Sequence, residues 1–429
     1  MINMIDSLIL YRPGEDELLR RLAKMPAGDE NGLFGCLGEL TALCEEHGFS
    51  GNLWHCYLTW YLVYHENVYS RACEIRGAVE GTINSAAIHD MDVFRRLFAE
   101  GGDLFKGTAC EKLWLSLLDY RNVSVLTNTF NSRIRDRICT LARTLAGCPD
   151  TESFTAAVNE FYHDFGVGKF GLHKAFRIRS ESGEVLIEPI TNIAHVYLED
   201  LVGYESAKKK LIDNTEAFLD GRSANNCLLY GDAGTGKSSS IKGILNRYYD
   251  RGLRVIEVYK HQLRDLNDVI TQIKSRNYRF IIYMDDLSFE EFETDYKYLK
   301  ALIEGGLEKK PSNVLIYATS NRRHLIRENY SDKEEIREDM HTSDTVQEKL
   351  SLVHRFGVTI YFGSPDKKEY NHIVEVLAQR CGVTMDRDEL ILEANKWELQ
   401  HGGLSGRTAQ QFIDYVTGTL MAPPRAEEE

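Results

Sequence analysis

The residues most able to do chemistry are Gly231 to Ser240, which read GDAGTGKSSS and begin with the pattern G-x-x-x-x-G-K-[ST]. Glycines in such a loop let backbone N–H groups turn toward phosphate oxygens at the start of a helix. Lys237 would contact the β- and γ-phosphates, and the hydroxyl of Ser238 would ligate Mg²⁺. An apolar strand precedes the loop and a helical pattern follows it, which predicts a phosphate-binding loop instead of an empty turn. The predicted contacts are Gly231, Asp232, Ala233, Gly234, Thr235, Gly236, Lys237, Ser238 and Ser239.

Two adjacent carboxylates form the second candidate. The apolar run FIIYMDDL predicts a buried strand that ends near Asp285, a residue type that holds Mg²⁺ in P-loop enzymes. Asp286 could orient and deprotonate the attacking water, although a Glu, one methylene longer, usually has this role, and Glu290 is an alternative base. Side chains alternate along an ideal strand, so two neighbouring Asp residues cannot both face one ligand, and a purely structural role for Asp286 stays open.

Three further polar residues complete the candidate site. Asn321 follows the strand VLIYATS and could hold the attacking water beside the γ-phosphate. Arg355, in LVHRFG, precedes the last strand, and nothing places it at its own phosphate. Such an arginine suits insertion into a neighbouring subunit's site, where it would stabilise transition-state charge. Arg407 opens the last helix and could reach the nucleotide within its own chain. A surface ion pair is the alternative for each arginine.

An alternation of strands and helices from residue 226 onward must position these side chains. Near-continuous apolar strands between helices indicate an α/β protein with a parallel sheet that is covered on both faces. The first half reads as helix, and a turn-rich Ser-Glu-Ser-Gly between two β-rich runs predicts a hairpin. Strands are expected at 175–178, 185–187, 227–231, 255–259, 280–285, 314–320 and 358–362, and closing helices at 367–380, 387–401 and 408–420.

These patterns divide the chain into five expected segments. Residues 1–168 form a helical N-terminal domain, 169–194 a hairpin and linker, 195–364 an α/β core, 365–421 a helical lid and 422–429 a disordered tail.

The composition of the chain disfavours several classes of binding partner. The net charge of −14 argues against broad, salt-driven binding of nucleic acid, although a local basic groove is compatible with it. Nine scattered cysteines without a C-x-x-C pair favour reduced thiols over a zinc ribbon or a disulfide framework. The most apolar stretch, 53–64, is shorter than the roughly 20 residues that a bilayer span needs, and the start lacks the basic region of a signal peptide. We therefore expect a cytoplasmic protein without a membrane partner.

The order of these elements resembles that of AAA+ ATPases, and most closely a bacterial AAA+ family catalogued as a domain of unknown function. The resemblance covers roughly residues 197–420 and rests on EDLVGYESAKKKL, NTEAFLDGRSANNCLLYGDAGTGKSSS, LIEGGLEKKPSNVLIYATSNRRHL, EKLSLVHRFG and GLSGRTAQQF. It implies ATP as the nucleotide, a five-stranded sheet of order 5-1-4-3-2, a C-terminal helical lid and assembly into a homo-oligomeric ring or partial ring.

The same resemblance assigns roles to individual residues. Lys237 and Ser238 would be Walker A, Asp285 and Asp286 Walker B, Asn321 sensor 1, Arg355 the arginine finger and Arg407 sensor 2, and Leu201, Val202 and Gly203 would pack on adenine. One departure is His354, where an Asp is expected before the finger, and it puts the anchoring of Arg355 in doubt.

The function expected from these features is Mg²⁺-dependent ATP hydrolysis at subunit interfaces, which moves or remodels a protein bound by the N-terminal domain. The alternative is a nucleotide-dependent switch or scaffold with negligible hydrolysis, which Asp286 in place of Glu would permit. A small-molecule kinase is disfavoured because it has no need of a helical lid or of Arg355. The charged, turn-rich residues 328–348 could border a subunit interface or a pore.

Overall fold

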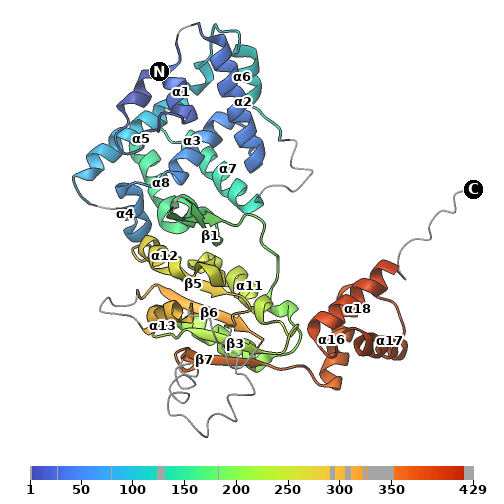
Figure 1. The fold of residues 1–429 in the computed structure, drawn as a ribbon. Coiled ribbons are helices and arrows are strands. Elements are labelled where there is room, and N and C mark those ends of the chain that lie inside the picture. The colour runs from blue at the N-terminus through green and yellow to red at the C-terminus, as the bar shows by residue number, and fades with distance from the viewer. Residues whose placement is uncertain are drawn as a thin grey trace, which may run out of the picture. The chain divides into compact units, whose positions relative to one another are not determined.

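The computed structural model describes residues 2–26, 28–78, 80–122, 131–181, 183–289, 295–304, 311–321, 325 and 352–419. The chain forms two compact units (Figure 1). The first contains Met1–Lys174 and Pro189–Asn192, and the second contains Ala175–Glu188 and Ile193–Glu429. Three features discussed above, namely Glu290, segment 328–348 and the tail 422–429, lie outside the described residues.

Helices build the first unit. They are η1 (Ile2–Ser7), α1 (Leu18–Lys24), α2 (Glu30–His47), α3 (Leu53–Tyr64), α4 (Val68–Arg76), α5 (Ile83–Glu100), η2 (Gly101–Asp103), α6 (Glu111–Leu117), α7 (Ser132–Ala146), α8 (Thr151–Phe165) and α9 (Gly168–Leu172). The most apolar of them, α3, is a buried core helix, as its length and composition predict, and it carries the buried side chains Trp54, Tyr57 and Leu62. Among the described residues, none of the helices has the length and hydropathy that a bilayer crossing needs.

A buried carboxylate fixes the start of the chain in the first unit. Asp90 of α5 is fully buried and accepts backbone N–H groups from Ile9, Leu10 and Tyr11 at 2.7–3.1 Å. The hydroxyl of Tyr11 lies 2.8 Å from that of Tyr162 on α8. A buried charge is costly unless hydrogen bonds satisfy it, so these three N–H groups allow Asp90 to hold the segment against the helices.

A seven-stranded sheet forms the centre of the second unit (Figure 1). Its strands are β1 (Ala175–Glu181), β2 (Glu184–Pro189), β3 (Cys227–Gly231), β4 (Leu253–Glu257), β5 (Arg279–Met284), β6 (Val314–Ser320) and β7 (Val358–Phe362). The order is β2-β1-β4-β5-β6-β3-β7, and the pairs from β1–β4 through β3–β7 are parallel. Numbered from β3, strands β3 to β7 follow the order 5-1-4-3-2, which confirms the order that the resemblance implied.

The expectation of a five-stranded sheet preceded by a separate hairpin is wrong. Strand β1 pairs in parallel with β4, with Ala175 opposite Val255, so β1 and β2 extend the sheet. Phe176 and Ile178 of β1 are buried, and Gln262 donates a hydrogen bond to the carbonyl oxygen of Ile178 at 2.9 Å. The buried strand β4 would otherwise expose an unpaired edge, which the hairpin covers.

The helices of the second unit cover the sheet and build the lid. They are η4 (Leu198–Asp200), α10 (Glu205–Leu219), α11 (Lys237–Tyr248), η5 (Tyr249–Arg251), η6 (Lys260–Asp265), α12 (Leu266–Ile273), α13 (Tyr296–Glu304) and the lid helices α16 (Lys367–Arg380), α17 (Arg387–Gln400) and α18 (Gly406–Thr419). The lid has its own small core around Tyr370, Val374 and Phe412, and Val202 packs against it.

Strands β3 and β7 approach each other tightly at the first glycine of the predicted phosphate loop. Gly231 pairs with Phe362, and a Cβ atom at Gly231 would lie 2.0 Å from the carbonyl oxygen of Phe362. Its φ of 139° also lies in a region that side chains with a Cβ rarely adopt. Gly231 is therefore required for pairing of the two strands as well as for the shape of the loop.

Gly231→Ala should lower the free energy of unfolding by about 1–3 kcal/mol more than Gly252→Ala, because only the first change forces the backbone apart. Gly252 is a matched control, since its φ is 85° and a Cβ there meets nothing within 4 Å. Urea unfolding of both variants, followed by circular dichroism, measures the difference. Equal losses would contradict a steric requirement at Gly231.

Candidate nucleotide-binding site

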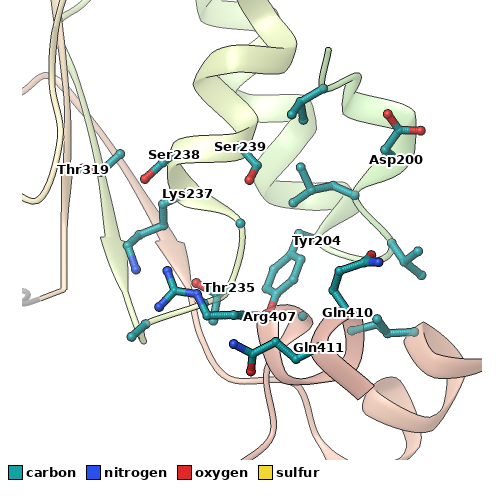
Figure 2. Close-up of a pocket in the computed structure, with 18 of the residues that line it drawn as sticks. Asp200, Tyr204, Thr235, Lys237, Ser238, Ser239, Thr319, Arg407, Gln410 and Gln411 are labelled. Atoms are coloured by element: carbon teal, nitrogen blue, oxygen red, sulfur yellow. The ribbon is translucent and has the colours of Figure 1, made fainter. Parts of the chain in front are cut away.

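A pocket of about 700 Å³ lies between the predicted phosphate loop and the lid helices α16 and α18 (Figure 2). It is lined by the loop from Ala233 to Ser239, by Asp285, Asp286 and Asn321 at the carboxyl ends of β5 and β6, and by Arg407. Its volume is typical of small-molecule sites. The parallel sheet brings these side chains together because the carboxyl ends of neighbouring strands share one edge, which is where ligands bind in open α/β sheets.

The phosphate loop is closed around the ammonium group of Lys237, the first residue of α11. Its Nζ donates to the carbonyl oxygens of Gly231 at 2.9 Å and Asp232 at 2.5 Å, and the side chain is buried. Burial lowers the pKa of Lys237, while nearby carboxylates, led by Asp232, oppose the shift. Figure 2 shows Lys237 and Arg407 directed toward the same part of the pocket. Two cations thus converge where an anionic ligand would be bound.

The loop also contacts the segment before α10. At Gly236, φ is 93° and a Cβ would lie 2.1 Å from the Cδ2 atom of Leu201, so glycine is needed for this approach. Leu201 and Val202 line the pocket together with Ile373 and Leu377 of α16, which gives it an apolar end. Gly203, which was predicted with them, lies outside the pocket lining and begins the turn into α10.

A chain of hydrogen bonds runs from the phosphate loop to Asn321. Ser238 donates its hydroxyl to Asp285 Oδ1 at 2.7 Å, and Thr319 donates its hydroxyl to the same oxygen at 2.5 Å. The oxygen of Thr319 in turn accepts the backbone N–H of Asp286 at 2.9 Å. Asn321 Nδ2 then donates to Asp286 Oδ1 at 2.7 Å. Polar groups after β3, β5 and β6 are therefore joined in one network.

The pKa of Asp285 is below its ordinary value, although burial of the carboxyl acts in the opposite direction. Hydrogen bonds from Ser238 and Thr319 outweigh burial because each of them favours the charged form. Asp285 is consequently ionised and can serve as a metal ligand at neutral pH.

The backbone turns sharply between the two carboxylates. Strand β5 ends at Met284, before either Asp, and Asp286 has a φ of 48° in the left-handed region. Such a conformation costs roughly 1–2 kcal/mol in a residue other than glycine, and the bond from its N–H to Thr319 helps to hold it. The alternation of an ideal strand therefore does not apply, and Asp285 and Asp286 both line the pocket.

Sequence reasoning missed Thr319. The side chain is 1% exposed, within a strand that is buried at every position. The available signal was a hydroxyl near the end of a mostly apolar run, two residues before Asn321 and hence on the same face of the strand.

The lid is tied to the phosphate loop through backbone groups. The N–H of Arg407 donates to the carbonyl oxygen of Gly234 at 3.1 Å, and the N–H of Ser364 donates to Asp232 Oδ2 at 2.7 Å. Tyr204, a second residue that sequence reasoning missed, donates its hydroxyl to the carbonyl oxygen of Gly363 at 3.0 Å. Asp232 is not part of the pocket lining. Its carboxylate instead connects the loop to the segment between β7 and α16.

Arg355 is not brought into the pocket of its own chain. It is half-buried and lies three residues before Val358, which pairs with Cys227 at the first residue of β3. Because β3 and β7 are parallel, the start of β7 lies at the edge of the sheet opposite the phosphate loop.

The oxygen atoms at Ser238 and Asp285 fit a hard divalent cation such as Mg²⁺. Across the described part of the chain, no group of three or more His, Cys, Asp or Glu side chains could hold a metal ion. A cation between Ser238 and Asp285 would thus take its other ligands from phosphate and water, which is the usual manner of binding for Mg²⁺.

Comparison with known protein families finds a match to one family model. The model described as "Protein of unknown function (DUF815)" matches residues 171–420, more than half of the chain, which confirms the predicted resemblance to a family catalogued in this way. A replication factor C large subunit from Staphylothermus marinus is 37% identical over 73 residues, or 17% of this chain and 16% of that protein. Two variant structures of RuvB from Thermotoga maritima are 17% identical, with a TM-score of 0.37 over 52% of this chain and 65% of each RuvB chain. The chain therefore spans less than two thirds of the length of each of these relatives.

Thr319→Val should lower the free energy of unfolding by about 1–3 kcal/mol, because it leaves the N–H of Asp286 without its partner and removes a bond to Asp285. Thr319→Ser keeps the hydroxyl and should cost less. Urea unfolding of the two variants at pH 7 measures the difference. If serine is more harmful than valine, packing of the methyl group that valine keeps and serine lacks, and not the hydroxyl, governs this position.

Proposed function

The chain belongs to the DUF815 family, and we propose that it binds ATP with Mg²⁺ and hydrolyses the terminal phosphoanhydride bond. The observation that carries this proposal is the hydrogen-bonded chain from Ser238 through Asp285, Thr319 and Asp286 to Asn321. It lies beside Lys237 at the carboxyl ends of three strands, where a γ-phosphate held by the loop would be adjacent to it. A metal ligand, a base and an amide donor are then all in place for one in-line displacement.

Each residue has a distinct task in this proposal. Loop N–H groups and Lys237 hold the phosphates, and Ser238 and Asp285 hold Mg²⁺, which would neutralise phosphate charge when bound. Asp286 accepts a proton from the attacking water, and Asn321 orients that water. The bond between Asn321 and Asp286 fixes the direction of the carboxylate, so the shorter Asp can replace a Glu.

The apolar end of the pocket supports adenine as the base. Leu201 and Val202, in the segment between η4 and α10, and Ile373 and Leu377 on α16 supply surfaces on which a flat ring can pack. Arg407, at the start of α18, would interact with the phosphates from the lid side.

We further propose that hydrolysis requires a second copy of the chain. Arg355 precedes β7 at the edge of the sheet away from its own phosphate loop, so its guanidinium suits the site of a neighbouring subunit. There it would stabilise charge on the transferred phosphoryl group, a contribution of about 10³–10⁵ in rate. In a closed ring every subunit gives one finger and receives another, and in a partial ring every subunit except the two at its ends does so.

Movement of the lid would convert hydrolysis into work on a protein partner. The loop is bonded to the segment between β7 and α16 through Asp232 and Ser364, and to the start of α18 through Gly234 and Arg407. A change of phosphate occupancy in the loop is therefore transmitted to α16–α18. The partner would be bound by the helical first unit.

A second candidate function is a nucleotide-dependent switch with negligible hydrolysis. The bond between Asp286 and Asn321 favours it, because Oδ1 of Asp286 already accepts a 2.7 Å hydrogen bond and is less available to an attacking water. ATP binding without turnover at every protein concentration would support this candidate over an ATPase.

Asp286→Asn should keep ATP affinity close to that of the unchanged protein and lower turnover by about 10²–10⁴-fold, because the amide cannot accept the proton. Lys237→Ala is the matched variant for binding and should lose ATP affinity itself. Binding of a fluorescent ATP analogue and release of phosphate measure the two effects. Full turnover in Asp286→Asn would move the base elsewhere, with Glu290 the next residue to test, and normal binding by Lys237→Ala would contradict the nucleotide site.

Arg355→Ala should bind ATP normally and lose turnover by at least about 10³-fold, because the finger acts on a neighbouring site. Neither Arg355→Ala nor Asp286→Asn should be active alone, but mixing them should restore activity, since Asp286→Asn subunits can donate Arg355 to sites that retain Asp286. Phosphate release from mixtures at increasing protein concentration measures this rescue. An absence of rescue, with activity per chain that is constant on dilution, would contradict catalysis in trans.

A further inference from the structure

Two thiols of the first unit face each other across a helix pair. Helix α3 packs against α7, and the Sγ atoms of Cys56 on α3 and Cys139 on α7 lie 3.9 Å apart. A disulfide bond is about 2.05 Å long, so the sulfurs need to approach by roughly 2 Å, shared between two side chains. Cys56 is buried, whereas Cys139 is partly exposed, so a small oxidant in solution reaches Cys139 first.

The surroundings of Cys139 favour its thiolate. Its pKa is lowered because the thiol of Cys56 donates a hydrogen bond to it, with smaller contributions from the backbone of Ser50 and from Arg135. Arg135 and Arg143 lie four residues before and after Cys139 and so share its face of α7. The carbonyl oxygen of Ser50 lies 3.8 Å from the sulfur of Cys56 and is the alternative acceptor for its single S–H when Cys139 is protonated.

We propose that Cys139 and Cys56 are a redox modification site, in which Cys139 reacts with a hydroperoxide and Cys56 then closes a disulfide between α7 and α3. This site is independent of the nucleotide pocket and of the proposed ATPase activity.

The reaction balances with hydrogen peroxide as the oxidant. The thiolate of Cys139 attacks one peroxide oxygen, the O–O bond breaks, and hydroxide leaves, which gives a sulfenic acid. The sulfur of Cys56 then attacks the sulfenic sulfur, the S–O bond breaks, and the proton of Cys56 leaves with the oxygen as water. Two thiols and one peroxide become one disulfide and two waters, so no further reductant or oxidant is needed.

Cys44 provides the contrast within the same core. It is fully buried, and burial raises the pKa of its thiol well above the ordinary range, so it stays protonated and unreactive. Cys381 of the second unit is exposed and serves as a reference for simple oxidation at a surface thiol.

The test treats the full-length protein with a small excess of hydrogen peroxide, blocks the remaining thiols with iodoacetamide under denaturing conditions, and measures intact and peptide masses. The expected product lacks two hydrogens, carries two fewer alkyl groups than the nine that the reduced chain takes, and yields one peptide pair joined through Cys56 and Cys139. Dithiothreitol should restore all the free thiols. Peroxide treatment should also raise the unfolding midpoint of the first unit, because the bond closes a long loop of the chain.

Two variants decide which sulfurs take part. Cys56→Ser should trap a sulfenic acid on Cys139, detectable with dimedone, without the peptide pair, whereas Cys44→Ser should form the pair as the unchanged protein does. The proposal is overturned if the unchanged protein accumulates singly oxidised Cys139, if all nine thiols remain alkylatable after peroxide, or if Cys44→Ser abolishes the pair.

Discussion

The candidate site depends on one hydroxyl group that joins the carboxylate of one Asp to the backbone N–H of the next. Thr319 donates to Asp285 and accepts from the backbone of Asp286, so it keeps the first side chain ionised and the second in a left-handed turn. Without this bridge, two adjacent Asp residues would point to opposite faces, and only one could reach the phosphate loop. Thr319 is itself fixed because β6 is buried between β5 and β3. The positions of both Asp side chains in the pocket thus depend on the order of the strands, which places Thr319 beside them.

Local sequence patterns were sufficient to predict the features that depend on residues close together in the chain. The loop at Gly231 to Ser240, the strands on either side of it and the lid helices were all predictable, because apolar periodicity and glycine placement act within a few residues. The order of the core strands required the resemblance to AAA+ proteins, since periodicity does not state which strand lies beside which.

The remaining features arise from contacts between distant segments. The pattern of β1 indicated a strand but not that it would pair with β4, about 80 residues later in the chain. The turn at Asp286 depends on Thr319, which lies 33 positions away. The pattern of the β5 strand alone therefore predicted that Asp285 and Asp286 face opposite sides, whereas both line the pocket. Likewise, the place of Asp232 in the loop did not indicate that its carboxylate accepts the N–H of Ser364, which is distant in the chain.

Because the chain enters the second unit to form the hairpin β1–β2 and then returns to the first, no single break in the backbone separates the two units. The backbone passes from the first unit to the second at residue 174, returns at 189, and leaves again after 192. A fragment that begins at residue 195 would retain every side chain of the pocket yet expose β4 as an unpaired, apolar edge, which is a template for aggregation. A fragment of the second unit that keeps β4 paired therefore begins no later than Ala175.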